Sequence, residues 1–221
     1  MLAWHFLSED KRLGYDDGRL VEVGQTLECE GKPVLCSNGM HGSERLIDAL
    51  KYASGPIVCR VEIEGDVIEG KNKLCGRRRT VLWMLDATDI LHEFACACAE
   101  DALALVEQPD ARSVAAIEAK RKWLKGEITD EELDAAWAAA WDAARDAASW
   151  AAASAASRDD ARDAAWDDAL AAAQAAAQAA WAASSAAAYA ASWAVTRDAA
   201  WAKQNERLTE MVMEAHENDE E

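Results

Sequence analysis

The sequence has no proline after Pro109 and no glycine after Gly126, although it contains 3 prolines and 11 glycines in total. Both residues interrupt helices and form tight turns, so their absence excludes turns that depend on them from the C-terminal part. Alanine, which has the highest helix propensity, is the commonest residue between Ala135 and Lys203. The change in composition near residue 127 therefore predicts a helical C-terminal region that follows a domain of a different kind.

Basic side chains are scarce. The chain has 23 Lys and Arg against 41 Asp and Glu, a net charge of −18, and residues 130–221 contain 19 acidic and 6 basic side chains. Because nucleic-acid binding needs clustered Lys and Arg against the phosphates, we expect no direct contact with nucleic acid. The acidity is interpreted as a solubilising surface for an alanine-rich helix. The alternative is a surface that competes for a basic partner.

The sequence also lacks a CxxC pair, a secretory leader pattern and an apolar run long enough to cross a membrane. We therefore expect a cytoplasmic protein without membrane contact, whose six cysteines remain reduced. A metal site built from His92, Cys96 and Cys98 is the alternative interpretation of the CxC spacing. That spacing is unspecific, so we predict no metal site.

Residues 1–108 are predicted to form an α+β domain, a small mixed or antiparallel sheet with helices. Leu2–Leu7 has the composition of a strand, and Pro56–Gly65 alternates apolar and polar side chains as a half-buried strand does. The segment Thr88–Glu107 has the apolar spacing of an amphipathic helix that would pack back on the sheet. A connecting helix and turn are expected over residues 109–128.

Residues 129–217 are predicted to form an all-α, alanine-rich extension. Thr129 and Glu132 have the spacing of a capping box at its start. Charged residues interrupt the apolar face near 154–160, where we expect a break or hairpin. Ser184 and Ser185 mark a second candidate break, and residues 218–221 are expected to form an acidic, frayed end.

Tryptophan supplies the apolar area that alanine lacks in this extension. The indoles are distributed around the helix axis, so they need more than one packing surface. We therefore expect the extension either to fold back as a helical hairpin or to associate with other chains, which predicts a homo-oligomer. The packing residues are expected to be Trp137, Trp141, Trp150, Trp166, Trp181, Trp193 and Trp201.

Three features of the N-terminal domain are candidates for ligand binding. His5 lies between two aromatic residues on the first predicted strand, and His41 and Ser43 follow a glycine turn. The triplet Arg77, Arg78 and Arg79 is a dense basic group and could bind phosphate. The alternatives are structural: the histidines as ordinary core or edge residues, and the arginines as a solvated strand start or a partner for the acidic tail.

The segments "AWHFL", "GYDDGR", "LCSNGMHGS" and "KLCGRRRTVLWMLDATDIL" resemble an uncharacterised family of N-terminal domains. Those domains occur in phage and bacterial proteins, commonly ahead of low-complexity C-termini. The resemblance covers about residues 1–105. It implies a phage or prophage protein in the cytoplasm of a bacterial host.

The N-terminal domain is also similar to ADP-ribosyltransferases of the rifampicin-modifying kind. The resemblance places His5 at the first-strand histidine that holds the NAD ribose, and it implies NAD or an NAD-derived nucleotide as ligand. His41 stands where those enzymes have a tyrosine. Glu62 and Asp66 are the nearest matches for their catalytic carboxylate.

We therefore expect a phage-type interaction protein directed against the host, active in counter-defence. It would bind a host protein or sequester a small nucleotide-derived ligand, without a resident cofactor, and assemble through its helical tail. One alternative is an ADP-ribosyltransferase-like enzyme that uses NAD. A further alternative is a structural component of a virion or scaffold.

Overall fold

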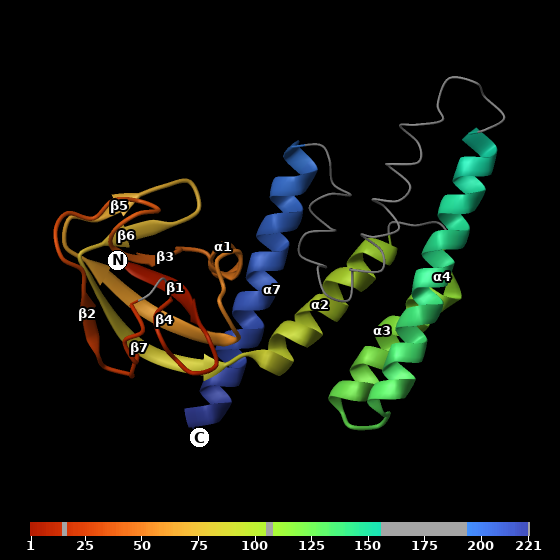
Figure 1. Ribbon diagram of the computed structural model, residues 1–221, viewed down its shortest axis with the longest axis horizontal. Helices are drawn as coiled ribbons and strands as arrows, with labels where there is room; N and C mark the ends of the chain where they lie inside the picture. The colour runs from red at the N-terminus through yellow and green to blue at the C-terminus, as the bar shows by residue number, and fades with distance from the viewer. Residues whose placement is uncertain (15–16, 105–107, 156–193, 221) are drawn as a thin grey trace. The chain divides into compact units, whose positions relative to one another are not determined.

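The computed structural model describes residues 1–14, 17–104, 108–155 and 194–220 (Figure 1). The chain forms two compact units. The first contains Met1–Leu91 together with Ala202–Glu221, and the second contains His92–Trp201. The predicted α+β class of the N-terminal region, followed by helices, is confirmed.

The first unit contains two small antiparallel sheets. The larger has the order β1-β4-β7-β2, and the smaller has the order β3-β6-β5 (Figure 1). The strands are β1 (Leu2–Leu7), β2 (Thr26–Glu28), β3 (Met40–Gly42), β4 (Ile57–Glu64), β5 (Ile68–Glu69), β6 (Leu74–Gly76) and β7 (Arg78–Asp86), with the short helix α1 (Leu46–Leu50) between β3 and β4. Two strands that composition and alternation predicted, β1 and β4, pair with each other.

The register of the larger sheet decides which side chains share a face. His5 of β1 lies opposite Cys59 of β4. The β4–β7 register shifts between Arg60 and Val61, and beyond the shift Ile63 lies opposite Arg79. Because side chains alternate along a strand, Arg79 lies on the same face of β7 as the core residue Val81.

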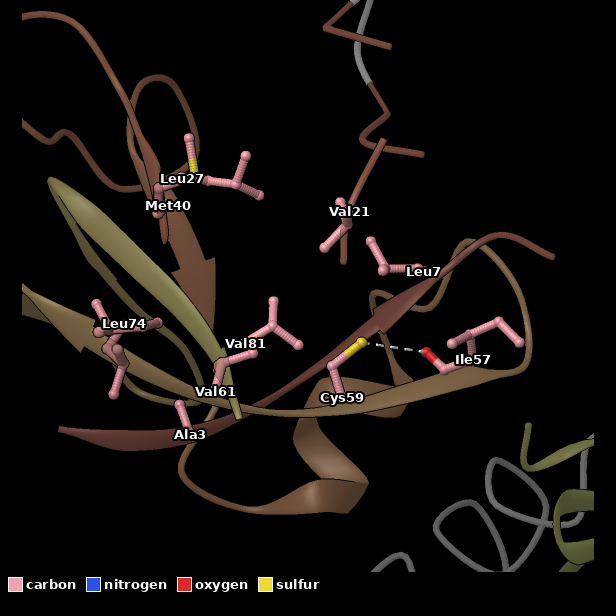
Figure 2. Packing of buried hydrophobic residues seen from close by; sticks show 11 residues of the cluster. Ala3, Leu7, Val21, Leu27, Met40, Ile57, Cys59, Val61, Leu74 and Val81 are labelled. Carbon is pink, nitrogen blue, oxygen red and sulfur yellow. Dashed lines mark hydrogen bonds between the residues drawn. The ribbon is translucent and has the colours of Figure 1, made fainter. Parts of the chain in front are cut away.

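An apolar cluster fills the interior of the first unit. Figure 2 shows side chains from both sheets converging with those of the segment before β2. The Cys59 thiol donates to the carbonyl oxygen of Ile57 at 3.9 Å. The members of the cluster are Ala3, Leu7, Val21, Leu27, Met40, Ile57, Cys59, Val61, Ile63, Leu74 and Val81.

The opposite face of the larger sheet is aromatic. Trp4 is buried and contacts Trp83 edge to face, with ring centroids 5.6 Å apart. The Arg60 guanidinium lies 4.4 Å from the Trp4 ring centroid, a cation–π contact.

Gly76 of β6 lies where the two sheets approach closely. A Cβ atom there would be 2.6 Å from the Glu64 carbonyl oxygen and 2.7 Å from Cγ2 of Ile63. We expect Gly76→Ala to lower the free energy of unfolding by about 1–3 kcal/mol or more through overpacking. Gly14→Ala is the control, because a Cβ at Gly14 would meet nothing within 4 Å. Urea unfolding of both variants measures the difference, and equal midpoints would contradict the close approach.

The C-terminal end of helix α7 (Ala194–Glu220) belongs to the first unit. Leu208 and Val212 are fully buried. The Asn205 side-chain oxygen accepts from the backbone N–H of Ile47 in α1 at 3.2 Å, and α7 passes beside α1 in Figure 1. The His216 ring stacks on Trp83 with centroids 4.0 Å apart.

This division differs from the predicted boundaries, which assigned residues 129–217 to one extension and residues 218–221 to a frayed end. The physical reason lies in the side chains of α7 beyond Ala202. Leu208 and Val212 bury apolar area that the alanine-rich stretch does not offer. The described helix also continues to Glu220.

The second unit contains most of α2 (Thr88–Leu103) together with α3 (Ala111–Leu124) and α4 (Asp130–Ala155). Arg121 of α3 forms ion pairs with Glu93 and Glu100 of α2. The predicted capping box is confirmed, since the Thr129 N–H donates to the Glu132 carboxylate at 2.9 Å and the Glu132 N–H donates to Oγ1 of Thr129 at 3.2 Å.

The described tryptophans of the extension differ in environment. Trp137 buries its indole nitrogen and has the Lys120 ammonium 5.8 Å from its ring centroid, whereas Trp141 is 39% exposed. Trp201 is partly buried. The predicted break near 154–160 extends beyond the described residues, and the break at Ser184 and Ser185 lies outside them. The same holds for the side chains of Trp150, Trp166, Trp181 and Trp193.

No helix in the described parts of the chain is both long and apolar enough to span a lipid bilayer.

Candidate anion-binding site

The arginine triplet separates into two exposed side chains and one buried side chain. Arg77 pairs with Asp66 at 3.2 Å. Arg78 lies 3.6 Å from the Glu64 carboxylate and 4.0 Å from that of Glu28. Arg79 is only 2% exposed. The triplet is therefore not one basic surface patch: Arg77 and Arg78 are neutralised by acids of their own unit, and Arg79 points into the interior.

Arg79 is a buried cation with incomplete hydrogen bonding. Its Nη1 donates to the His41 carbonyl oxygen at 2.9 Å. Its Nε and Nη2 are buried and have no hydrogen-bond partner among the described residues. Burial lowers the pKa of Arg79 to about 10, so the guanidinium remains charged at neutral pH. Most buried donors in proteins are paired, so these two require an explanation.

His5 and His41 lie near enough to Arg79 to feel its charge, and both are partly buried. Burial lowers the pKa of His5 well below its ordinary value of 6.5, and the nearby Arg79 and, when protonated, His41 lower it further. Burial also lowers the pKa of His41, opposed by a backbone hydrogen bond to Gly39. The Nε2 atom of His41 accepts the backbone N–H of Cys36 at 3.2 Å, which requires that nitrogen to be unprotonated. Both imidazoles are therefore neutral at pH 7.

Ser43 joins this region through its backbone. Its N–H donates to the Trp4 carbonyl oxygen at 2.9 Å, and its carbonyl accepts from the Trp4 N–H at 2.7 Å. These bonds connect the end of β3 to β1 next to His5. The hydrogen bonds described for Ser43 thus position the strand that carries the histidine.

Sequence reasoning missed three residues near Arg79. Burial raises the pKa of the Cys59 thiol to about 12, so Cys59 is neutral. Asp17 and Arg19 both act electrostatically on Arg79, and they pair with each other at 2.6 Å. The alternation of β4 could have identified Cys59, since it lies opposite His5. No sequence pattern indicates that Asp17 and Arg19 approach Arg79.

The two carboxylates considered for a transferase lie elsewhere. Glu62 is exposed and alternates with the buried Val61 and Ile63, so it is on the opposite face of β4 from the interior. Asp66 is exposed and pairs with Arg77. Across the described residues, no group of three or more His, Cys, Asp and Glu side chains is arranged to hold a metal ion, and all six cysteines are free thiols.

The free energy of unfolding is expected to fall as pH drops below 6.5, the ordinary histidine pKa. The folded-state pKa values of His5 and His41 are lower than this, so the unfolded chain takes up protons that the folded protein does not. The stabilisation is complete above pH 6.5 and is lost towards lower pH, at up to about 1.4 kcal/mol per pH unit for each histidine. Urea unfolding at several pH values measures the slope. An unchanged slope in the double variant His5→Gln/His41→Gln would contradict this assignment.

Residues 1–93 match the model of a protein family described as a domain of unknown function (DUF7666). Neither the curated proteins nor the solved structures contain a match to the chain. The family match includes His5, His41 and Arg79, whereas α7 lies beyond it. The three candidate ligand-binding residues are thus contained entirely in the part of the chain that matches this family.

Proposed function

We propose that the first unit is a binding module that sequesters a small, anionic, nucleotide-derived ligand without converting it. The observation that carries the proposal is the buried guanidinium of Arg79, two of whose nitrogens have no hydrogen-bond partner among the described residues, near two neutral histidines. A buried charge of this kind is costly without a counter-ion, and an anionic ligand would supply one. Neutral imidazoles would add hydrogen-bond donors and acceptors without adding charge.

Binding is favoured over catalysis by the positions of the carboxylates. A glycosyl-transfer reaction of NAD develops positive charge on the ribose, which a nearby carboxylate stabilises. Glu62 and Asp66 lie away from the interior cluster, as described above. An ADP-ribosyltransferase-like activity therefore remains the alternative, and the ligand experiment distinguishes it.

The biological setting that we propose is a phage protein that acts on its bacterial host in the cytoplasm, in counter-defence. The resemblance of residues 1–105 to N-terminal domains of phage and bacterial proteins supports this setting. Sequestration of a host nucleotide signal fits this setting. Each protein molecule that is made would bind signal molecules and so lower the free concentration of the signal.

Calorimetry of the full chain with NAD, ADP-ribose and cyclic ADP-ribose tests the proposal. We expect heat of binding with at least one of them and no new product by chromatography. His5→Ala and His41→Ala should each weaken binding at least tenfold while the circular dichroism spectrum is unchanged; His92→Ala, in the second unit, is the control. Turnover would favour the enzyme. Absence of heat with all three would favour a host protein as the target or a scaffold role.

A second proposal concerns assembly. Trp141 of α4 is 39% exposed, a large aromatic side chain on a helix that is otherwise rich in alanine. We infer that it contributes to self-association of the chain. Light scattering after size-exclusion chromatography should show an oligomer that is weakened by Trp141→Ala and retained in the control Asp142→Ala. A monomeric wild-type chain would contradict self-association.

A further inference from the structure

The two unpaired nitrogens of Arg79 form one edge of its guanidinium. The Nε–H and one N–H of Nη2 point to the same side, where they match the two oxygens of a carboxylate or phosphate. The same protein shows this edge in use elsewhere. Arg19 donates from Nε at 2.6 Å and from Nη2 at 2.7 Å to the two oxygens of Asp17.

Arg112 repeats the arrangement on Asp110, with Nε at 3.1 Å and Nη2 at 2.9 Å from the two carboxylate oxygens. Both of these pairs are exposed. Arg79 differs because its edge is buried and unfilled, while its remaining nitrogen is fixed by the His41 carbonyl oxygen at 2.9 Å. That bond holds the guanidinium plane, so the open edge has a defined direction.

The charged groups near this edge of Arg79 limit how much negative charge the bound group can carry. Arg79 contributes one positive charge, and burial favours the neutral forms of His5, His41 and Cys59. Asp17, the acid that acts on Arg79, already pairs with Arg19. An oxyanion group with one negative charge at this edge is neutralised by Arg79, whereas a second charge on the same group would be buried without a counter-ion.

We propose that the Nε and Nη2 edge of Arg79 is a binding site for a singly charged oxyanion, a phosphodiester or a carboxylate. The inference rests on the proposed function for its role and names the class of ligand. Both nitrogens are sealed from solvent in this structure, so the ligand reaches them only when neighbouring side chains move apart.

Titration of the ¹⁵N-labelled full chain at pH 8 tests the site directly, with the Arg79 Nε–H signal as readout. The probes are dimethyl phosphate and acetate, each singly charged, and methyl phosphate, which is doubly charged at this pH. We expect a saturable shift with at least one singly charged probe, and at least tenfold weaker binding of methyl phosphate. Comparison of dimethyl phosphate with acetate identifies whether a phosphodiester or a carboxylate is preferred.

Arg79→Lys keeps the charge and removes the two-nitrogen edge, so it should weaken binding at least tenfold. Arg78→Lys is the matched control on the exposed neighbour and should bind as the wild type does. Asp17→Asn removes a nearby negative charge and should tighten binding severalfold, which keeps the test valid if Arg79→Lys fails to fold.

Each outcome has one meaning for the proposal. Equal or tighter binding of methyl phosphate overturns the single-charge assignment and leaves sequestration intact. No shift with any probe overturns the site itself. Binding of the simple anions without binding of NAD, ADP-ribose or cyclic ADP-ribose supports the site and contradicts the nucleotide-derived ligand of the proposed function.

Discussion

Replacement of Arg79 by methionine is expected to stabilise the ligand-free protein. The variant removes a buried charge and two unpaired donors, and it loses one hydrogen bond to the His41 carbonyl oxygen. Because each unsatisfied buried donor costs about 1–3 kcal/mol and a typical hydrogen bond contributes about 1 kcal/mol, we expect a net gain of about 1–5 kcal/mol. Urea unfolding of the ligand-free chain at pH 7.5 measures the change.

Arg78→Met is the control for this result. Arg78 is partly exposed, and its ion pairs with Glu28 and Glu64 lie at the surface, so the change should stay within about 0.5 kcal/mol. The stabilised Arg79→Met protein should also lose affinity for anions. A loss of stability of several kcal/mol would instead assign Arg79 a structural role and would remove the reason for a ligand.

Truncation of Leu208 to alanine is expected to destabilise the first unit by about 2–5 kcal/mol, although this residue lies far beyond the family match. Leu208 is fully buried in the part of α7 that belongs to this unit. The loss is a large fraction of the stability of a typical domain. Urea unfolding followed by tryptophan fluorescence measures it, since Trp4 and Trp83 belong to the same unit.

Glu210→Ala is the matched control, because Glu210 is exposed on the same helix and alanine preserves helix propensity. Its midpoint should match that of the wild type. If Leu208→Ala were as stable as the wild-type protein, Leu208 would contribute little to the core of the first unit, and α7 would only pack on its surface.

The elements with strong local signals could be predicted from the sequence. β4 alternates buried and more exposed side chains from Cys59 to Glu64, β1 is aromatic and apolar, and the capping box at Thr129 and Glu132 marks the start of α4. These features depend on short-range periodicity and on backbone hydrogen bonds. The docking of α7 depends on a contact between Ile47 and Asn205, which nothing local encodes.

The candidate site was predicted in part. His5, His41 and Arg79 were identified by residue type, and the structure brings these three together. The sequence could not separate Arg79 from Arg77 and Arg78. The separation depends on strand alternation and on which face of β7 meets the interior, and both follow from the register with β4. Residue type therefore indicated that arginine and histidine side chains could bind an anion. The pairing of β7 with β4 determined that Arg79, and not Arg77 or Arg78, points into the interior.

The return of α7 to the first unit has a consequence for biosynthesis. Residues up to Leu91 are synthesised before the stretch His92–Trp201, and Ala202–Glu221, which complete the same unit, are synthesised after it. At about 5–20 residues per second, the intervening stretch delays completion by about 5–20 s. During that interval the nascent chain lacks part of its core, and prematurely terminated products lack it permanently. Only chains translated through α7 acquire the finished unit, so completion of the first unit requires synthesis of the whole intervening stretch.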